Sequence, residues 1–188
     1  MGDIDESNDL LWIDEALQGR MRSFSNLILK YQDRIYTFVV RSITNREDAE
    51  DITQNVFIGA FSNLKKFRKE CSFKTWLYRI AANRIKNYWR DKKNRFVIAE
   101  SELASIIEEY GNRTGEISDA SNETESEDLK QIVANLIASL PLELRQIFVL
   151  YYVTGCTCQQ IAEIFKTSAS NIKIQLFRGR KYLFDRFK

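Results

Sequence analysis

Residues 73–95 read FKTWLYRIAANRIKNYWRDKKNR, and this stretch decides the expected fold. At 100° per residue, its apolar and basic side chains separate onto two faces of one long helix. The face suited to burial carries Leu77, Ala81, Ile85, Tyr88 and Trp89. The opposite face carries Arg79, Asn83, Lys86 and Arg90. Cations in one stripe, with an amide among them and aromatic rings beside them, suit a nucleic-acid strand. A merely solvated basic face fits the isolated helix equally well.

Three further helices are expected before this one. The first lies between a cap at Ser7 or Asn8 and Gly19, and the second covers residues 24–43. Thr44 and Glu47 have the spacing of a capping box, so a third helix is expected from there to about residue 64. With a basic loop over residues 65–72, residues 8–95 form a compact four-helix bundle.

The third expected helix carries two notable groups of side chains. Ile58 lies on an exposed face beside Asp51, Gln54 and Asn55, which indicates a protein-docking patch. Its first turn also gathers acidic residues, namely Glu47, Asp48, Glu50 and Asp51. Acids in a first turn stabilise the helix dipole, and this reading is favoured over a metal site or an acid/base pair.

The C-terminal part of the chain has a different character. Residues 96–128 are rich in Asp and Glu opposed only by Arg113, and they are interpreted as a flexible acidic linker. Helices are then expected after residue 129, after Pro141 and after the capping-box pair Thr157 and Gln160. Residues at the spacing of a helix-turn-helix core follow, namely Ile161, Ala162, Phe165 and Ile172. In the last helix, Lys173, Arg178, Arg180 and Lys181 are available to phosphates or base edges.

Composition narrows the class of protein. The 188 residues include 44% hydrophobic residues, seven glycines and one proline, which favours an all-α protein of two small helical domains. No apolar run approaches membrane-spanning length and the N-terminus is acidic, so a cytoplasmic protein without direct membrane insertion is expected. There is no histidine, and the three cysteines (Cys71, Cys156 and Cys158) are too few to close a metal site. No metal, no cofactor and no enzymatic activity are therefore expected.

Charge is strongly segregated although the formal net charge is only +2. Residues 65–95 and the C-terminal 23 residues are basic, whereas residues 96–128 are acidic. Two basic blocks separated by an acidic one indicate two polyanion-binding modules joined by a connector that does not bind.

Three motifs in this order carry a resemblance to a known family. They are DAEDITQNVFIGAF over residues 48–61, FKTWLYRIAANRIKNYWR over residues 73–90, and IQLFRGRKYL over residues 174–183. Together they resemble the bacterial RNA polymerase sigma factors, and more narrowly the extracytoplasmic-function (ECF) group, which keeps only sigma domains 2 and 4. The resemblance implies domain 2 over residues 8–95, a linker over 96–128 and domain 4 over 129–188.

The resemblance also implies roles for particular residues. Contact with core RNA polymerase is implied for Asp51, Gln54, Asn55, Ile58 and Phe61. Recognition and melting of the −10 promoter element are implied for the loop that contains Phe67 and for Asn83. Tyr78, Arg79, Lys86 and Arg90 are further candidates for contact with the strand or its phosphates. Recognition of the −35 element is implied for Lys173, Phe177, Arg178 and Arg180. The implied partners are the two largest subunits of core RNA polymerase, promoter DNA and an anti-sigma factor.

Some positions depart from the family pattern. Asn55 occupies a position where the family often has Glu, and Lys166 occupies a turn position often taken by Gly. Ser170, Asn171 and Ile174 also differ from the common pattern, which leaves the base preference open.

Two other functions are compatible with parts of the sequence. A stand-alone helix-turn-helix regulator would use only the C-terminal domain, but it would not need the basic helix over residues 73–95. A nuclease using Glu47, Glu50 and Asp51 would need a convergent acid set beyond one helix turn, and the sequence shows none.

Overall fold

The computed structural model describes the backbone of residues 8–43, 45–106 and 135–186, with side chains described over the same ranges except 94–106. Every described element is helical, so the prediction of an all-α fold is confirmed. The N-terminal domain comprises α1 (Asp9–Leu17), α2 (Met21–Ile43), α3 (Arg46–Ser62), η1 (Leu64–Lys66) and α4 (Phe73–Ile106). The C-terminal domain comprises a helical turn at residues 135–139, α6 (Leu142–Phe148), the π-helical segment η2 (Val149–Val153), α7 (Cys158–Phe165) and α8 (Ala169–Arg186).

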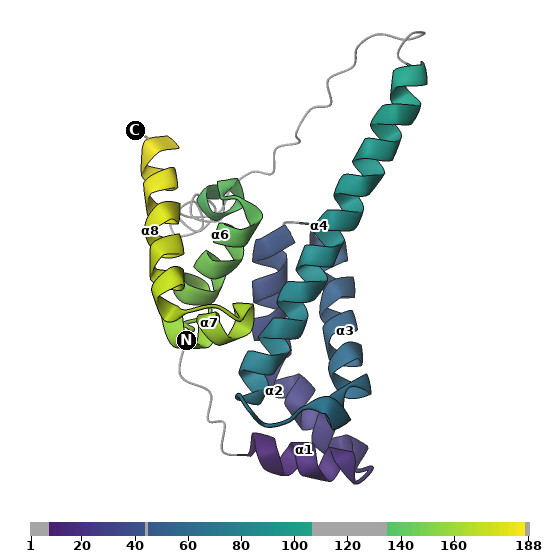
Figure 1. The fold of residues 1–188 in the computed structure, drawn as a ribbon. Coiled ribbons are helices and arrows are strands. Elements are labelled where there is room, and N and C mark those ends of the chain that lie inside the picture. The colour runs from purple at the N-terminus through teal and green to yellow at the C-terminus, as the bar shows by residue number, and fades with distance from the viewer. Residues whose placement is uncertain (1–7, 44, 107–134, 187–188) are drawn as a thin grey trace, which may run out of the picture.

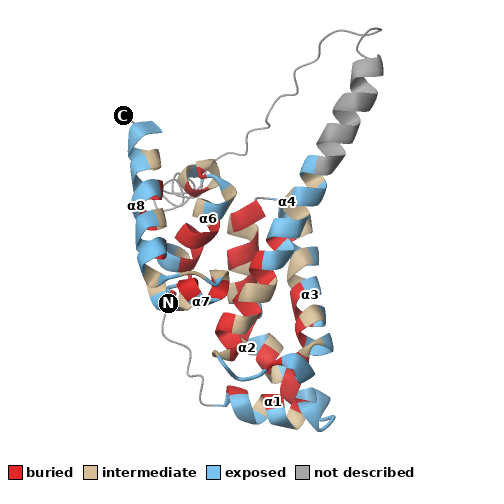
Figure 2. Ribbon diagram, viewed as in Figure 1, coloured by how far each residue is buried: buried red, intermediate tan, exposed pale blue. Residues whose placement is uncertain are grey.

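The core of the N-terminal domain lies between α2, α3 and α4, where buried residues of the three helices face one another (Figure 2). Its fully buried members include Ala49, Val56 and Ala60 on α3. On α4 they include Leu77, Ala81 and Ile85, which belong to the predicted apolar face. Burial of such side chains contributes roughly 1.5–3 kcal/mol each for the larger ones, which fixes the faces that remain outside.

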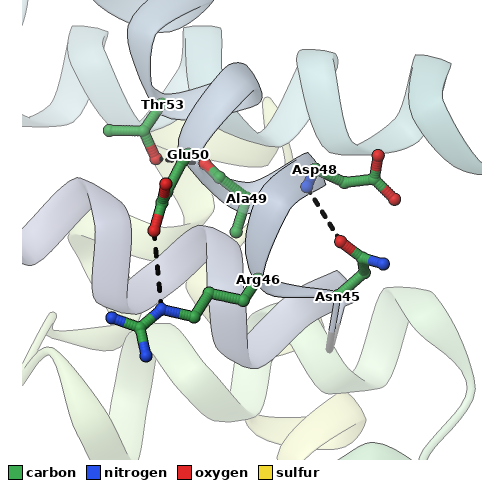
Figure 3. Close-up of polar contacts among 6 residues, drawn as sticks. All are labelled: Asn45, Arg46, Asp48, Ala49, Glu50 and Thr53. Carbon is green, nitrogen blue, oxygen red and sulfur yellow. Dashed lines mark hydrogen bonds and ion pairs between the residues drawn. The ribbon is translucent and has the colours of Figure 1, made fainter.

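The helix boundaries differ from expectation at two points. The capping box predicted at Thr44 is wrong: Asn45 is the N-cap of α3, and its side chain accepts a 2.9 Å hydrogen bond from the Asp48 N–H (Figure 3). The helix that begins at Phe73 continues to Ile106 instead of ending near residue 95, and Figure 1 shows it projecting beyond the bundle. The helix thus extends over residues 96–106 of the predicted linker, while residues 107–128 of that prediction lie outside the described residues.

The C-terminal domain has the predicted helix-turn-helix. Both hydrogen bonds of the Thr157–Gln160 capping box are present at the start of α7. Lys166 ends α7 in the left-handed region, with φ 53°, as expected for a position where glycine is more usual. Behind the motif, α8 crosses α6 so closely that a Cβ at Gly179 would lie 2.2 Å from a Phe148 ring carbon.

The two domains contact each other, an arrangement that sequence reasoning left open. α7 packs against α4, and α6 and η2 pack against α2. In Figure 1 the C-terminal domain accordingly lies beside the lower half of α4, while the upper part of that helix stands apart.

Candidate polymerase and nucleic-acid interfaces

One face of α3 is exposed along its length and carries the residues predicted to dock on a protein. They are Asp51, Gln54, Asn55, Ile58 and Phe61. Ile58 is 60% exposed and Phe61 is 41% exposed, although both are large apolar side chains. Phe61 is held in place by Phe24 of α2, with ring centroids 5.0 Å apart. The structure therefore brings these five residues together as one surface, polar toward the start of α3 and apolar toward its end, which we call the α3 face.

A cavity of about 310 Å³ opens between the end of α3 and the basic side of α4. It is lined by Gly59, Asn63, Lys66, Trp76, Arg79, Ile80, Asn83 and Arg84. The lining combines an indole ring, three cationic side chains and two side-chain amides. We call this pocket the α4 cavity. An aromatic surface with cations around it matches the chemistry of a nucleotide, since bases stack and phosphates need positive charge.

Local packing builds the α4 cavity. A Cβ at Gly59 would lie 3.3 Å from Nη2 of Arg84, so glycine lets that guanidinium lie against the α3 backbone. Trp76 packs on the rings of Phe67 and Phe73, at centroid distances of 5.0 and 5.7 Å. The indole is therefore supported from behind by two further aromatic rings.

Two of the residues predicted to contact the −10 strand are buried. Phe67 is only 8% exposed and packs against Trp76, while its contact with the −10 strand stays a prediction. Tyr78 is 1% exposed, with its ring edge-on against Phe38 at 5.5 Å. Burial is also the main cause that raises the pKa of Tyr78 above its ordinary value. A helical wheel places Tyr78 beside the basic stripe, but the second domain covers that part of α4.

The other predicted strand residues divide into two groups. Asn83 and Arg79 line the α4 cavity, whereas Lys86 and Arg90 lie exposed one and two turns further along the helix. Arg79 also donates a 2.8 Å hydrogen bond from Nη2 to the carbonyl oxygen of Glu163 in α7.

Residues of α8 form the candidate duplex-reading surface. Lys173, Phe177, Arg178 and Arg180 are all exposed, as predicted for a reading helix. Arg180 donates a 3.0 Å hydrogen bond to the Tyr152 hydroxyl, which directs its side chain across η2. At the start of α8, the Asn171 side-chain amide donates a 2.9 Å hydrogen bond to the Thr167 hydroxyl.

Sequence reasoning missed part of the α4 cavity. Trp76, Asn63 and Arg84 line it, yet none was singled out. Trp76 carried a detectable signal, because an aromatic residue lies next to a basic stripe there. Asn63 and Arg84 carried none, because their meeting depends on the crossing of α3 and α4.

The acidic first turn of α3 is engaged in structural contacts. The Asp48 carboxylate accepts a 2.7 Å hydrogen bond from the Tyr88 hydroxyl of α4. Glu50 pairs with Arg46 at 3.5 Å on the helix surface (Figure 3). Within the described residues, no group of three His, Cys, Asp or Glu side chains is arranged to hold a metal ion.

Comparisons with known proteins identify the family. The model of Sigma-70 region 2 matches residues 27–95, and that of Sigma-70, region 4 matches residues 130–183. The ECF RNA polymerase sigma-E factor of Haemophilus influenzae is 31% identical over 95% of both chains. That of Escherichia coli K12 is 32% identical over 94% of this chain and 93% of its own. The chain belongs to the ECF sigma factors. It is thus an RNA polymerase-binding subunit that directs transcription initiation.

Solved sigma factor structures share the fold of this ECF sigma factor. CnrH, solved in complex with the cytosolic domain of CnrY, is 18% identical with a TM-score of 0.66 over 94% of this chain and 95% of CnrH. RpoE of Bartonella quintana, solved with the anti-sigma factor NepR, is 19% identical with a TM-score of 0.63 over 87% and 96%. The matches to both domains remove the reason for a stand-alone helix-turn-helix regulator. Within the described residues, no helix has both the length and the hydrophobicity that a membrane span requires.

Proposed function

We propose a division of labour between three surfaces of this sigma factor. The α3 face docks on core RNA polymerase, the α4 cavity captures an unpaired base of the −10 element, and α8 reads the −35 element as duplex. The observation that carries the proposal is the α4 cavity, a basic and aromatic-lined pocket on the same domain as the exposed α3 face.

Exposure and chemistry support the docking role of the α3 face. An exposed isoleucine and phenylalanine flanked by polar residues form a small apolar patch, and such patches mark protein interaction sites. The resemblance assigns this face to the clamp-helices coiled coil of the largest polymerase subunit. Asn55 occupies a position where the family often has Glu, so this surface carries one negative charge fewer.

The α4 cavity supports base capture. Removing a base from a duplex stack costs a few kcal/mol, and the protein must recover this free energy. Stacking on an aromatic side chain such as Trp76 contributes about 1–3 kcal/mol per base. Asn83 can both donate to and accept from a base edge, and the adjacent Arg79, Arg84 and Lys66 are placed for phosphates.

The C-terminal domain supports duplex reading. An α-helix fits the major groove of B-form DNA, and α8 follows a helix-turn-helix turn with its cations exposed. Arg178 and Lys173 are free to contact phosphates or guanine edges, while Arg180 lies against Tyr152.

An anti-sigma factor is the proposed inhibitory partner. CnrH and the Bartonella RpoE were both solved in complex with a second protein, in the latter case an anti-sigma factor. The exposed α3 face and the exposed apolar side chains of α8, Ile174 and Phe177, are surfaces that such a partner could cover.

Run-off transcription with purified bacterial core RNA polymerase tests the proposal. Addition of the sigma factor should produce promoter-dependent transcripts from a genomic promoter library. A gel shift with duplex promoter DNA should show weak binding by the free protein and specific binding with core polymerase. No transcript above the core-only background would contradict the proposal.

A further inference from the structure

A cavity of about 920 Å³ lies between α4 and the C-terminal domain, and we call it the interdomain cavity. Pockets that bind small molecules have volumes of about 300–1,000 Å³, so the cavity is large enough for such a ligand. One wall belongs to α4, and the facing wall is built from α6, α7, the turn after α7 and the start of α8. Among their described lining residues, the interdomain cavity and the α4 cavity share Arg79 and Asn83 alone, so they are separate sites.

The buried part of the lining is apolar except for one amide. Ile147, Ile164 and Ile172 line the cavity and are at most 6% exposed. Gln146 lines it too and is 5% exposed, and its Nε2 donor has no hydrogen-bond partner. A buried donor without a partner costs free energy. A ligand that places an acceptor beside Gln146 therefore recovers a hydrogen bond that the protein alone does not make.

The outer part of the lining is basic. Lys86 of α4 and Lys166 of the turn after α7 are exposed on opposite walls. Arg79 is half-buried in the lining, and its Nε donor is buried without a hydrogen-bond partner. Glu143 is the one acidic residue of the described lining. Three cations against one carboxylate favour a ligand with more than one negative charge.

We propose that the interdomain cavity is a binding site for a ribonucleotide, with the base on the buried lining and the phosphates between the cations. An amide such as that of Gln146 can donate to and accept from the edge of a base. A carboxylate such as that of Glu143 is suited to ribose hydroxyls. An inorganic anion would leave the apolar lining uncovered, and an apolar carboxylate would leave the Gln146 amide without a partner.

A bound nucleotide would compete with the promoter strand. This consequence rests on the proposed function of α4, because Arg79, Asn83 and Lys86 line the cavity and are also predicted strand contacts. At a nucleotide concentration ten times its dissociation constant, the apparent affinity of the free chain for a −10 oligonucleotide should fall about tenfold. Fluorescence anisotropy of a fluorescein-labelled oligonucleotide measures this competition, and unchanged strand affinity would contradict it.

Isothermal titration calorimetry of the purified chain with each of the four ribonucleoside triphosphates tests the site directly. At least one of them should bind about tenfold or more tightly than its nucleoside or inorganic triphosphate, since each part uses only some of the lining. Equal affinities for the nucleotides and for inorganic triphosphate would overturn the proposal, because the buried lining would then contribute nothing.

Two substitutions change the wall that faces α4. Gln146→Leu nearly keeps the size of the side chain and removes the amide, so it should weaken nucleotide binding about five- to tenfold. Lys166→Gly removes a cation at a backbone position with φ 53°, which suits glycine, and should weaken binding about two- to fivefold. Arg46→Ala removes a cation from an exposed site on α3 and should bind nucleotide like the wild type. Circular dichroism checks each fold, and if Gln146→Leu loses helicity, Lys166→Gly decides the result.

Lys66→Ala tells the two cavities apart, because Lys66 lines the α4 cavity and does not belong to the described lining of the interdomain cavity. Loss of nucleotide binding in this variant, with wild-type affinity in folded Gln146→Leu and Lys166→Gly, would overturn the proposal. Nucleotide binding that depends on Gln146 and Lys166, in a chain that binds no single strand even with core polymerase, would support the site and contradict the proposed function of α4.

Discussion

Asn83 lines two cavities, the α4 cavity and a cavity of about 920 Å³ between α4 and the C-terminal domain. Asn83→Ala removes the one amide of α4 placed to bond an unstacked base edge. We expect promoter opening to fall about five- to thirtyfold, in line with the loss of 1–2 kcal/mol for a hydrogen bond of this kind. Permanganate footprinting of open complexes measures this effect.

Asn87 gives a matched control for that variant. It is exposed on the same helix, one turn further along, and lines neither cavity. Asn87→Ala should open promoters like the wild type, and both variants should bind core polymerase normally. Loss of core binding in Asn83→Ala would show that the strand face has been misplaced.

Gly179 is important for the stability of the C-terminal domain. The added Cβ of Gly179→Ala would lie 2.2 Å from the Phe148 ring, which is too close for any non-bonded contact. Overpacking of this kind typically costs about 1–3 kcal/mol. We expect a lower thermal midpoint for the C-terminal domain by circular dichroism, whereas Ser170→Ala on the exposed side of α8 should change little.

At the scale of elements, α3 is the helix with the clearest separate function. Ile58→Glu places a charge in the apolar part of the α3 face, where desolvation of the carboxylate opposes docking. We expect at least a tenfold loss of affinity for core polymerase, equivalent to about 1.4 kcal/mol, measured by fluorescence anisotropy. Leu29→Glu is the control, since Leu29 is 67% exposed on α2 and lies outside that face. Equal losses in both variants would contradict a localised docking surface.

The helices themselves were largely predictable from local pattern. The Thr157–Gln160 box, the buried stripe of α3 and the apolar face of α4 depend on residues within a few positions of each other. The end of α4 was not predictable in this way, because the acidic residues after position 95 have the composition of a linker and yet continue a helix to Ile106. The cap of α3 was misplaced by one residue, since Thr44 and Asn45 are both good capping residues and the backbone selects Asn45.

At the scale of the whole molecule, the sequence predicted some of the candidate surfaces and not others. The α3 face and the α8 surface follow from single-helix patterns, and both appear where the pattern places them. The α4 cavity and the burial of Tyr78 depend on which elements cross α4, and no local pattern encodes that crossing. Local pattern does not settle the role of Phe67 either, because a loop aromatic can face a ligand or support another ring, and only the packing shows that it lies against Trp76.

Among the described residues, the hydrogen bonds from Arg79 to Glu163 and from Arg145 to Ser42 join the two domains. So limited a polar contact predicts that the domains unfold separately. Calorimetry of Gly179→Ala should show the transition of the C-terminal domain moving to lower temperature while the other transition stays within a few degrees. Val56→Ala, in the core of the N-terminal domain, should move the opposite transition. A single transition that shifts as a unit in both variants would mean that the domains are tightly coupled.

The close packing of α3 on α4 at Gly59 bears on where transcription starts. The α3 face and the α4 cavity belong to one rigid body, joined by buried Val56 and Ala60 and by the Arg84 guanidinium against the α3 backbone. On the proposed assignment, the distance from the polymerase anchor to the captured base is therefore constant. The first transcribed nucleotide would then be chosen by a fixed molecular ruler, and changes in the length of the linker would alter promoter spacing without moving the start point.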